Sequence, residues 1–184
     1  MEKNRLSKVE KIENYFNILT KYPLLSLLLI GIGAITMRLI FFQNELIFAS
    51  DDMSYFKYAI DLSLTGDSPS AIYMPNNGWP LFVSIFFHFF ESNNFLDYMN
   101  LQSYISIVLS TITIIPLYFL AKKFTNTLFA LISTIFFVFE PRIIANSLGG
   151  ITDPLFILLI VTSLTLILQK NKFIIYGACI TIGL

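Results

Sequence analysis

Charged residues are scarce in this chain of 184 residues: Asp, Glu, Lys and Arg make up 13%, while 55% of the residues are hydrophobic. A soluble domain has about 25% charged residues, which it needs to cover its surface. The mean hydropathy of +0.71 agrees with this deficit. The composition therefore excludes an ordinary soluble protein and predicts an integral membrane protein.

Other features are also missing. The single cysteine, Cys179, excludes an intramolecular disulfide and a cysteine metal cluster, and its apolar surroundings favour a packing role. The chain has no internal repeat, low-complexity tract, glycine-rich phosphate loop or zinc-ligand spacing. Nothing in it points to nucleic acid as a partner. The basic residues near the N-terminus are explained more simply as a topology signal.

Long apolar runs take the place of the missing charge. A basic tail at 1–21 precedes a run at 22–42, which is long enough to cross a bilayer core of roughly 30 Å. The run continues past Arg38, so it predicts an uncleaved transmembrane helix rather than a signal peptide. Further spans are predicted at 101–121, 127–145 and 154–169, with an incomplete fifth at 173–184. Residues 22–184 thus form a transmembrane domain, and the incomplete span indicates an N-terminal fragment of a longer protein.

The short run at 80–90 decides the topology. Its 11 residues make only about 16 Å of helix, roughly half of a span. If it lies in the membrane interface, nine of the twelve Lys and Arg residues fall on the inner side, as the positive-inside rule requires. The sequence therefore predicts an all-α polytopic membrane protein with a cytoplasmic N-terminus. A large outer loop at 43–100 would carry 80–90 as an interfacial helix, after a turn at 75–78.

A second interfacial helix is predicted at 51–65 in the same loop. Ser50 can cap its start, and Gly66 suits its end. Apolar residues recur between them at spacings of three and four: Met53, Phe56, Ile60 and Leu64. We expect this amphipathic helix to lie on the outer surface.

Acidic residues gather at the predicted outer ends of the spans. Asp51 and Asp52 follow the first span, and Asp153 opens the fourth. Each has a plain alternative role, because carboxylates in a first helical turn interact favourably with the helix dipole, and Thr152, Asp153 and Pro154 make a good helix start. Their position on one membrane face nevertheless predicts a functional site.

Ionisable residues near the ends of spans add to this group. Arg38, Glu140 and Arg142 are functional candidates by default, because charge inside a membrane is costly. For Arg38 the alternative is snorkelling to the interface, and for Glu140 it is a helix end or kink before Pro141. His88 is expected on the polar face of its helix.

Three short segments then resemble a known family. Met37-Arg38-Leu39, the run from Asp51 to Tyr55 and the run from Asn77 to Leu81 are similar, in this order, to the GT-C glycosyltransferases. The best agreement is with glycosyltransferase family 39, which includes protein O-mannosyltransferases and lipid A aminoarabinose transferases. The stretch from Asn146 to Asp153 resembles the second outer loop of the oligosaccharyltransferase catalytic subunit, except that Leu155 stands where that pattern has a second carboxylate.

The resemblance implies a chemistry. An inverting transferase would move a sugar from a polyprenyl-phosphate donor to a protein, glycan or lipid acceptor on the extracytoplasmic face of the cell membrane. Asp51, or else Asp52, would be the general base. The implied donor-phosphate or supporting residues are Asp153, Glu140, Arg142, Lys57 and Tyr55.

A divalent cation, Mg²⁺ or Mn²⁺, is the only cofactor that the resemblance implies, with Asp51 and Asp153 as its candidate ligands. Leu155 argues against it and favours the mannosyltransferase-like branch. Two other classes stay open. A multi-pass transporter would hold its acidic residues near the bilayer midplane. A non-catalytic membrane assembly subunit would need no acidic pair.

Overall fold

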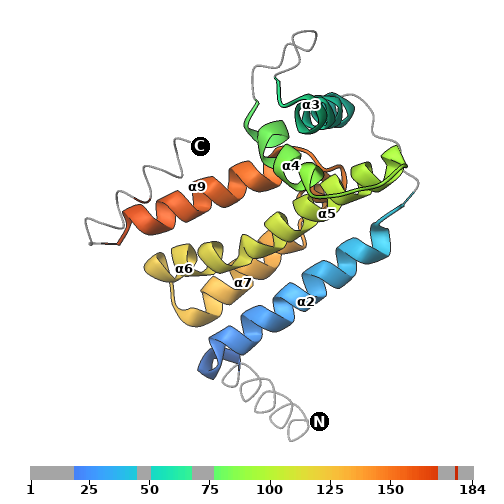
Figure 1. Ribbon diagram of the computed structural model, residues 1–184. Helices are drawn as coiled ribbons and strands as arrows, with labels where there is room; N and C mark the ends of the chain where they lie inside the picture. Colours follow the sequence, from blue (N-terminus) through green and yellow to red (C-terminus); the bar gives the residue numbers. More distant parts are fainter. Residues whose placement is uncertain (1–18, 45–50, 68–76, 170–176, 178–184) are drawn as a thin grey trace, which may run out of the picture.

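The computed structural model describes residues 19–44, 51–67, 77–169 and 177. Every regular element in these ranges is a helix, which confirms the all-α prediction for this part of the chain (Figure 1). The helices are α2 (Pro23–Phe41), α3 (Asp51–Thr65), α4 (Gly78–His88), α5 (Phe95–Ile112), α6 (Ile114–Phe124), α7 (Thr127–Val138), α8 (Pro141–Leu148) and α9 (Asp153–Ile167). The predictions for 1–18, Ser50 and most of 173–184 lie outside the described residues.

Among the described residues, two helical stretches are long and apolar enough to cross a membrane. One is α2, with 19 residues, and the other joins α5 and α6 over the 30 residues Phe95–Phe124. The predicted span at 101–121 lies within the second stretch, whose helix begins earlier, at Phe95. Asn94 caps it earlier, because its side chain accepts a hydrogen bond from the Leu96 amide at 3.0 Å, and Asp97 occupies the first turn.

The predicted span at 127–145 is divided between α7 and α8, which meet at an angle of 51°. Pro141 has no amide hydrogen, its ring clashes with a helical carbonyl, and it pushes the preceding residue out of the helical region. Glu140 accordingly has φ −64° and ψ 126°, and its carboxylate caps α8 by accepting from the Ile143 amide at 2.8 Å. Counted as one bent unit, α7 and α8 supply a third membrane-crossing segment by length and composition.

The remaining predicted helices differ mainly in length. The 15 residues of α9 make about 22 Å of helix, which is less than the roughly 30 Å of a bilayer core. The range 154–169 is therefore a short apolar helix rather than a full-length span. Helix α4 begins two residues before the predicted position 80, so Gly78 and Trp79 lie in the helix and not in a preceding turn.

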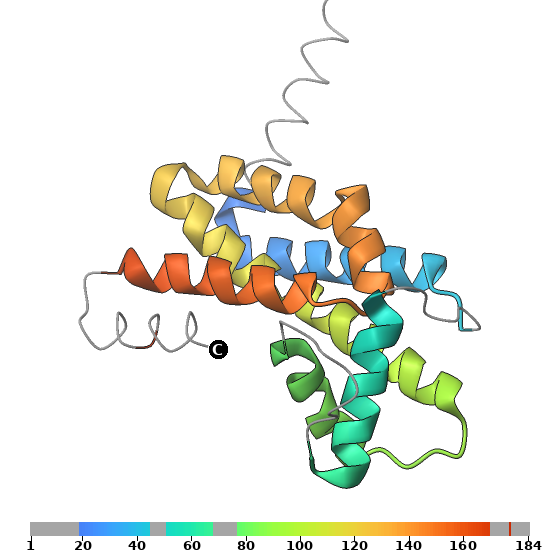
Figure 2. The same ribbon diagram turned by 90° about the horizontal axis from the view of Figure 1, so that it is seen from above.

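Helix α3 has the predicted bounds, and the signal at its C-terminal end is local. Gly66 follows its last turn with a φ of +75°, a value that favours glycine, and its amide bonds to the Leu62 carbonyl at 3.0 Å. Phe56 and Ile60 are buried against α4, whereas Leu64 is 76% exposed. Figure 2 shows the α3–α4 pair at one end of the bundle.

Two buried clusters hold the helices together. The first joins α3, α4 and α5 through Phe56, Ala59, Ile60, Trp79, Val83, Phe87, Met99 and Ile105. The second joins α2, α6 and α7 through Leu27, Ala34, Ile114, Tyr118, Ala130, Leu131 and Val138. Most other apolar side chains of α2 are exposed, as expected of a helix that faces lipid.

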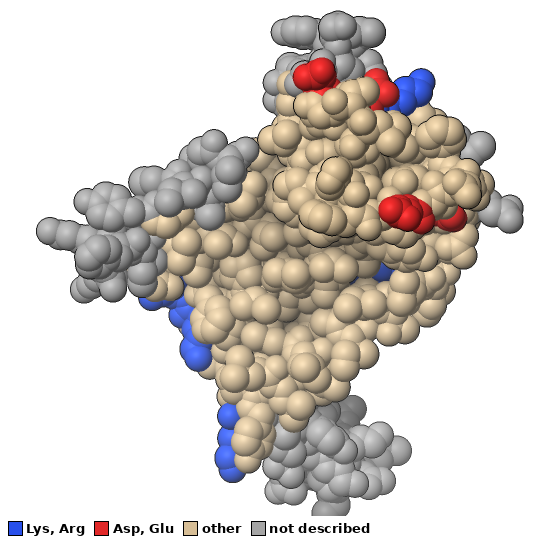
Figure 3. All heavy atoms as spheres, viewed as in Figure 1, with Lys and Arg blue, Asp and Glu red and all other residues tan. Residues whose placement is uncertain are grey.

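Three lysines lie at the end of the molecule away from the acidic first turn of α3. The rings of Phe42 and Tyr104 lie 4.7 Å apart, so the last residues of α2 lie beside the first half of α5. Lys21, before α2, therefore lies at the same end as Lys122 and Lys123 in the last turn of α6. In Figure 3 basic side chains gather at the lower left, acidic ones lie at the top and right, and another basic side chain lies beside the acidic ones at the top right. This separation is the one that the positive-inside rule favours.

Candidate functional site

The first turn of α3 and the start of α9 come together in the structure. Leu155, two residues after Asp153, packs against the same buried cluster as Met53 and Tyr55 of α3. Figure 2 shows the first turn of α3 beside the segment that leads into α9. Asp51 and Asp153 are 102 positions apart in the sequence but lie at the same end of the bundle.

Tyr55 is the side chain that both carboxylates influence. Burial raises the pKa of its phenol, and the negative charges of Asp51 and Asp153 raise the pKa further. Both carboxylates must therefore lie within electrostatic range of Tyr55. At neutral pH the phenol stays protonated and can donate a hydrogen bond to an anionic or sugar oxygen.

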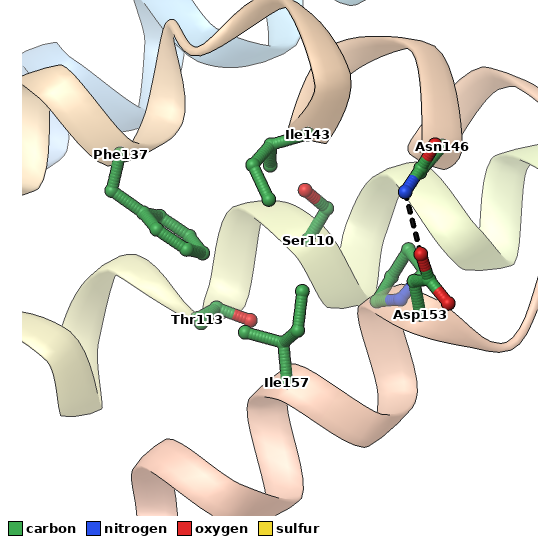
Figure 4. Close-up of a pocket in the computed structure, with 8 residues that line it drawn as sticks. Ser110, Thr113, Phe137, Ile143, Asn146, Asp153 and Ile157 are labelled. Carbon is green, nitrogen blue, oxygen red and sulfur yellow. Dashed lines mark hydrogen bonds between the residues drawn. The ribbon is translucent and has the colours of Figure 1, made fainter.

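Asp153 is half-buried and held by one neighbour. Asn146 of α8 donates a hydrogen bond from Nδ2 to Oδ2 of Asp153 at 2.5 Å (Figure 4). Both side chains line a cavity of about 10 Å³, across which lie Ser110 of α5 and Thr113, the residue between α5 and α6. That volume admits about one water molecule. The carboxylate thus has one fixed oxygen and a small recess behind it with both polar and apolar lining residues.

The loop before Asp153 is anchored at one carbonyl. Gly150 has a φ of +63°, which favours glycine, and its carbonyl accepts two hydrogen bonds at 2.8 Å, from Trp79 Nε1 and from Gln102 Nε2. Both donors are buried and come from different helices. Sequence reasoning missed this anchor, although the paired glycines and the single tryptophan were its visible signals.

The other candidates are placed less closely together. Asp51 is exposed and Asp52 half-buried, both in the first turn of α3, where the dipole-capping alternative also puts them. Lys57 and Arg142 are exposed, and neither forms an ion pair within the described ranges. The alternative for Glu140, a helix end or kink before Pro141, agrees with the structure, since α7 ends at Val138 and Glu140 caps α8.

The arrangement offers little for a metal ion. No three His, Cys, Asp or Glu side chains in the described part of the chain are grouped so that they could hold one. Asp51 and Asp153 are two carboxylates, and Leu155 packs into the apolar cluster. Mg²⁺ takes about six oxygen ligands and is often held by one or two carboxylates, with water and substrate phosphate supplying the rest, so Asp51 and Asp153 stay its candidate ligands.

Among the exposed residues of α4 is His88, whose ring lies 5.4 Å from that of Phe89. It is exposed in the last turn of the helix, where the neighbouring Ile85 and Phe89 are exposed as well.

No protein-family model, curated protein or solved structure matches this chain. Its function must therefore be argued from the arrangement of its own residues.

Proposed function

We propose that this protein is a membrane glycosyltransferase that moves a sugar from a polyprenyl-phosphate donor to an acceptor hydroxyl at the extracytoplasmic membrane face. The observation that carries the proposal is the meeting of α3 and α9, which gathers Asp51, Tyr55 and Asp153 at the end of the bundle away from Lys122 and Lys123. A transferase that uses a lipid-linked donor needs a carboxylate at this kind of boundary.

In the proposed reaction Asp51 is the general base. Its exposed carboxylate takes the proton from the acceptor hydroxyl as that oxygen attacks the anomeric carbon of the donor. The new glycosidic bond forms as the bond from the anomeric carbon to the phosphate oxygen breaks, with inversion. The lipid phosphate leaves with the electron pair of the broken bond. Asp52, on the same turn, is the alternative base.

The remaining residues bind and orient. Tyr55 keeps its proton at neutral pH and can donate to a sugar or phosphate oxygen, because burial and two nearby carboxylates raise its pKa. Asp153, held by Asn146, can accept from a sugar hydroxyl. Lys57 and Arg142 are exposed cations that can approach the leaving phosphate. The exposed apolar residues of α2 offer the donor's tail a surface within the bilayer.

The test is sugar transfer from a labelled polyprenyl-phosphate donor in membranes holding the full-length protein. Asp51→Asn or Asp52→Asn should lower transfer by about a hundredfold or more, the usual cost of losing a general base. Asp61→Asn is the matched control, since Asp61 is exposed on the same helix beyond the first turn, and it should leave transfer unchanged.

A second candidate, a transporter, is favoured by the break between α7 and α8, because transporters build their sites on interrupted helices. The same experiment separates the two candidates. If the parent protein transfers no sugar from a broad panel of donors, or both variants keep full transfer, the role of Asp51 and Asp52 is only to interact with the dipole of α3. The transporter or the non-catalytic assembly subunit would then be preferred.

A further inference from the structure

Arg38 is fully buried, with 0% of its surface exposed, although its neighbours Leu39 and Ile40 in α2 are largely exposed. Snorkelling to the interface was the simple alternative for this residue, and it is wrong. The side chain turns into the bundle. A charge in such a position is costly unless it is well bonded, so its partners are informative.

Four hydrogen bonds tie the guanidinium to four helices. Within α2, Nη1 donates to the Ala34 carbonyl at 3.1 Å. Nε donates to Ser147 Oγ of α8 at 3.0 Å, and Nη2 donates to Ser110 Oγ of α5 at 2.9 Å and to the Val138 carbonyl of α7 at 3.4 Å. Among the described residues these partners are hydroxyls and carbonyls, with no carboxylate.

The bond to Val138 explains why a cation is placed here. Val138 is the last residue of α7, and the break at Glu140 and Pro141 leaves the final carbonyls of that helix without their usual partners. These carbonyls form the negative end of the helix dipole. Arg38 therefore caps the interrupted helix and offsets part of its own burial cost there.

The bond to Ser147 connects this cap to the acidic end of the bundle. The Ser147 hydroxyl accepts from Arg38 and donates to the Ile144 carbonyl at 2.7 Å, so its orientation is fixed. The adjacent residue in α8, Asn146, holds Asp153. Ser110, the second hydroxyl partner, lines the same small cavity as Asn146 and Asp153. Arg38 thus bonds to two residues that are close to Asp153: Ser147, which adjoins its partner Asn146, and Ser110, which lines the same cavity.

We propose that Arg38 is the positioning residue that caps the break between α7 and α8 and thereby holds Asp153 at the start of α9. Its effect on catalysis rests on the proposed glycosyltransferase function. The positioning itself does not, and it can be measured without any sugar donor.

The experiment uses the full-length protein in lipid nanodiscs with Cys179→Ser and a reporter, Thr152→Cys. Thr152 is half-buried next to Asp153, and its side chain makes no capping hydrogen bond. The rate of labelling by a water-soluble maleimide reports how often this loop opens. Arg38→Met should raise the rate by about tenfold or more, because interhelical hydrogen bonds that restrain local opening are lost.

Two milder variants keep the test decisive if Arg38→Met does not fold. Arg38→Lys keeps the charge but loses the planar fork, and Ser147→Ala removes one bond, so both should raise the rate by less than Arg38→Met. Ser26→Ala is the matched control. It removes a buried hydroxyl of α2 that bonds only to the nearby Leu19 and Tyr22 carbonyls, and it should leave the rate unchanged.

An unchanged labelling rate in every folded variant would overturn the proposal and reduce Arg38 to packing. Faster labelling in a protein that transfers no sugar would refute the proposed function and leave the positioning role standing. Where transfer is measurable, Arg38→Lys should lower kcat more than it raises KM, because Asp153 is displaced rather than the donor excluded. A change in KM alone would contradict a positioning role.

Discussion

The double anchor on the Gly150 carbonyl gives the sharpest prediction about stability. Trp79 Nε1 and Gln102 Nε2 both donate to this buried oxygen at 2.8 Å, so either donor alone can satisfy it. Gln102 is 0% exposed, and its Oε1 has no hydrogen-bond partner among the described residues. Losing one donor should therefore cost much less than losing both.

The magnitudes follow from this arrangement. Gln102→Met removes one hydrogen bond but also one unsatisfied buried oxygen, so the free energy of unfolding should change by less than about 1 kcal/mol. Trp79→Phe should cost about 1–2 kcal/mol through one hydrogen bond and some lost packing. The double variant leaves the carbonyl without a donor, so it should cost about 1–2 kcal/mol more than the sum of the single variants.

Unfolding in mixed detergent and SDS micelles measures these differences. Far-UV circular dichroism must be the signal, because Trp79 is the only tryptophan and its fluorescence is lost with it. The control pairs Trp79→Phe with Thr134→Val, a buried hydroxyl of α7 that bonds within its own helix to the Ala130 carbonyl. That pair should be additive. Additivity in the Trp79 and Gln102 pair would refute the shared-carbonyl reasoning.

Two further predictions concern α3. The raised pKa of Tyr55 means that the folded state keeps the phenol proton to higher pH than the unfolded chain does. The free energy of unfolding therefore keeps the full contribution of Tyr55 below about pH 10, and this contribution is lost as pH rises through the folded pKa. Tyr55→Phe should therefore weaken the alkaline loss of thermal stability above about pH 10, and an identical decline in both proteins would contradict the assignment. Gly66→Ala should lower stability by about 1 kcal/mol, because φ is +75° in open space, and Gly66→Asn by less; equal melting temperatures would show that the turn relaxes.

Local signals made parts of this fold predictable. The bounds of α3 follow from residues within or next to it, and Gly66 ends it as expected. The start of α5 was missed because hydropathy rises only at Leu101, whereas Asn94 already caps the helix. Pro141 signalled an interruption of the helix. Whether it would only kink the helix or separate two helices at 51° depends on partners that are distant in the sequence.

The candidate site shows the same division. Asp51 and Asp153 could be named from the sequence because each begins an apolar or amphipathic helix. Their common neighbour Tyr55 could be suspected only by resemblance, and the sequence did not show which residues Gly150 and Arg38 would contact. Arg38 and Ser147 are 109 positions apart, and Trp79 and Gly150 are 71 apart. Contacts of this kind depend on how helices pack, which no local rule encodes.

The length of the α5–α6 stretch can be compared with the thickness of a bilayer. The 22 residue steps from Gln102 to Phe124 span about 33 Å along a helix, close to the thickness of a hydrocarbon core. If the lysines beside Phe124 lie at one headgroup layer, the Gly150 carbonyl bonded to Gln102 would lie near the other. The first turns of α5 would then lie in the headgroup region. A phosphate at headgroup depth, with its hydrocarbon chain still in the leaflet, would reach Asp153 without leaving the membrane.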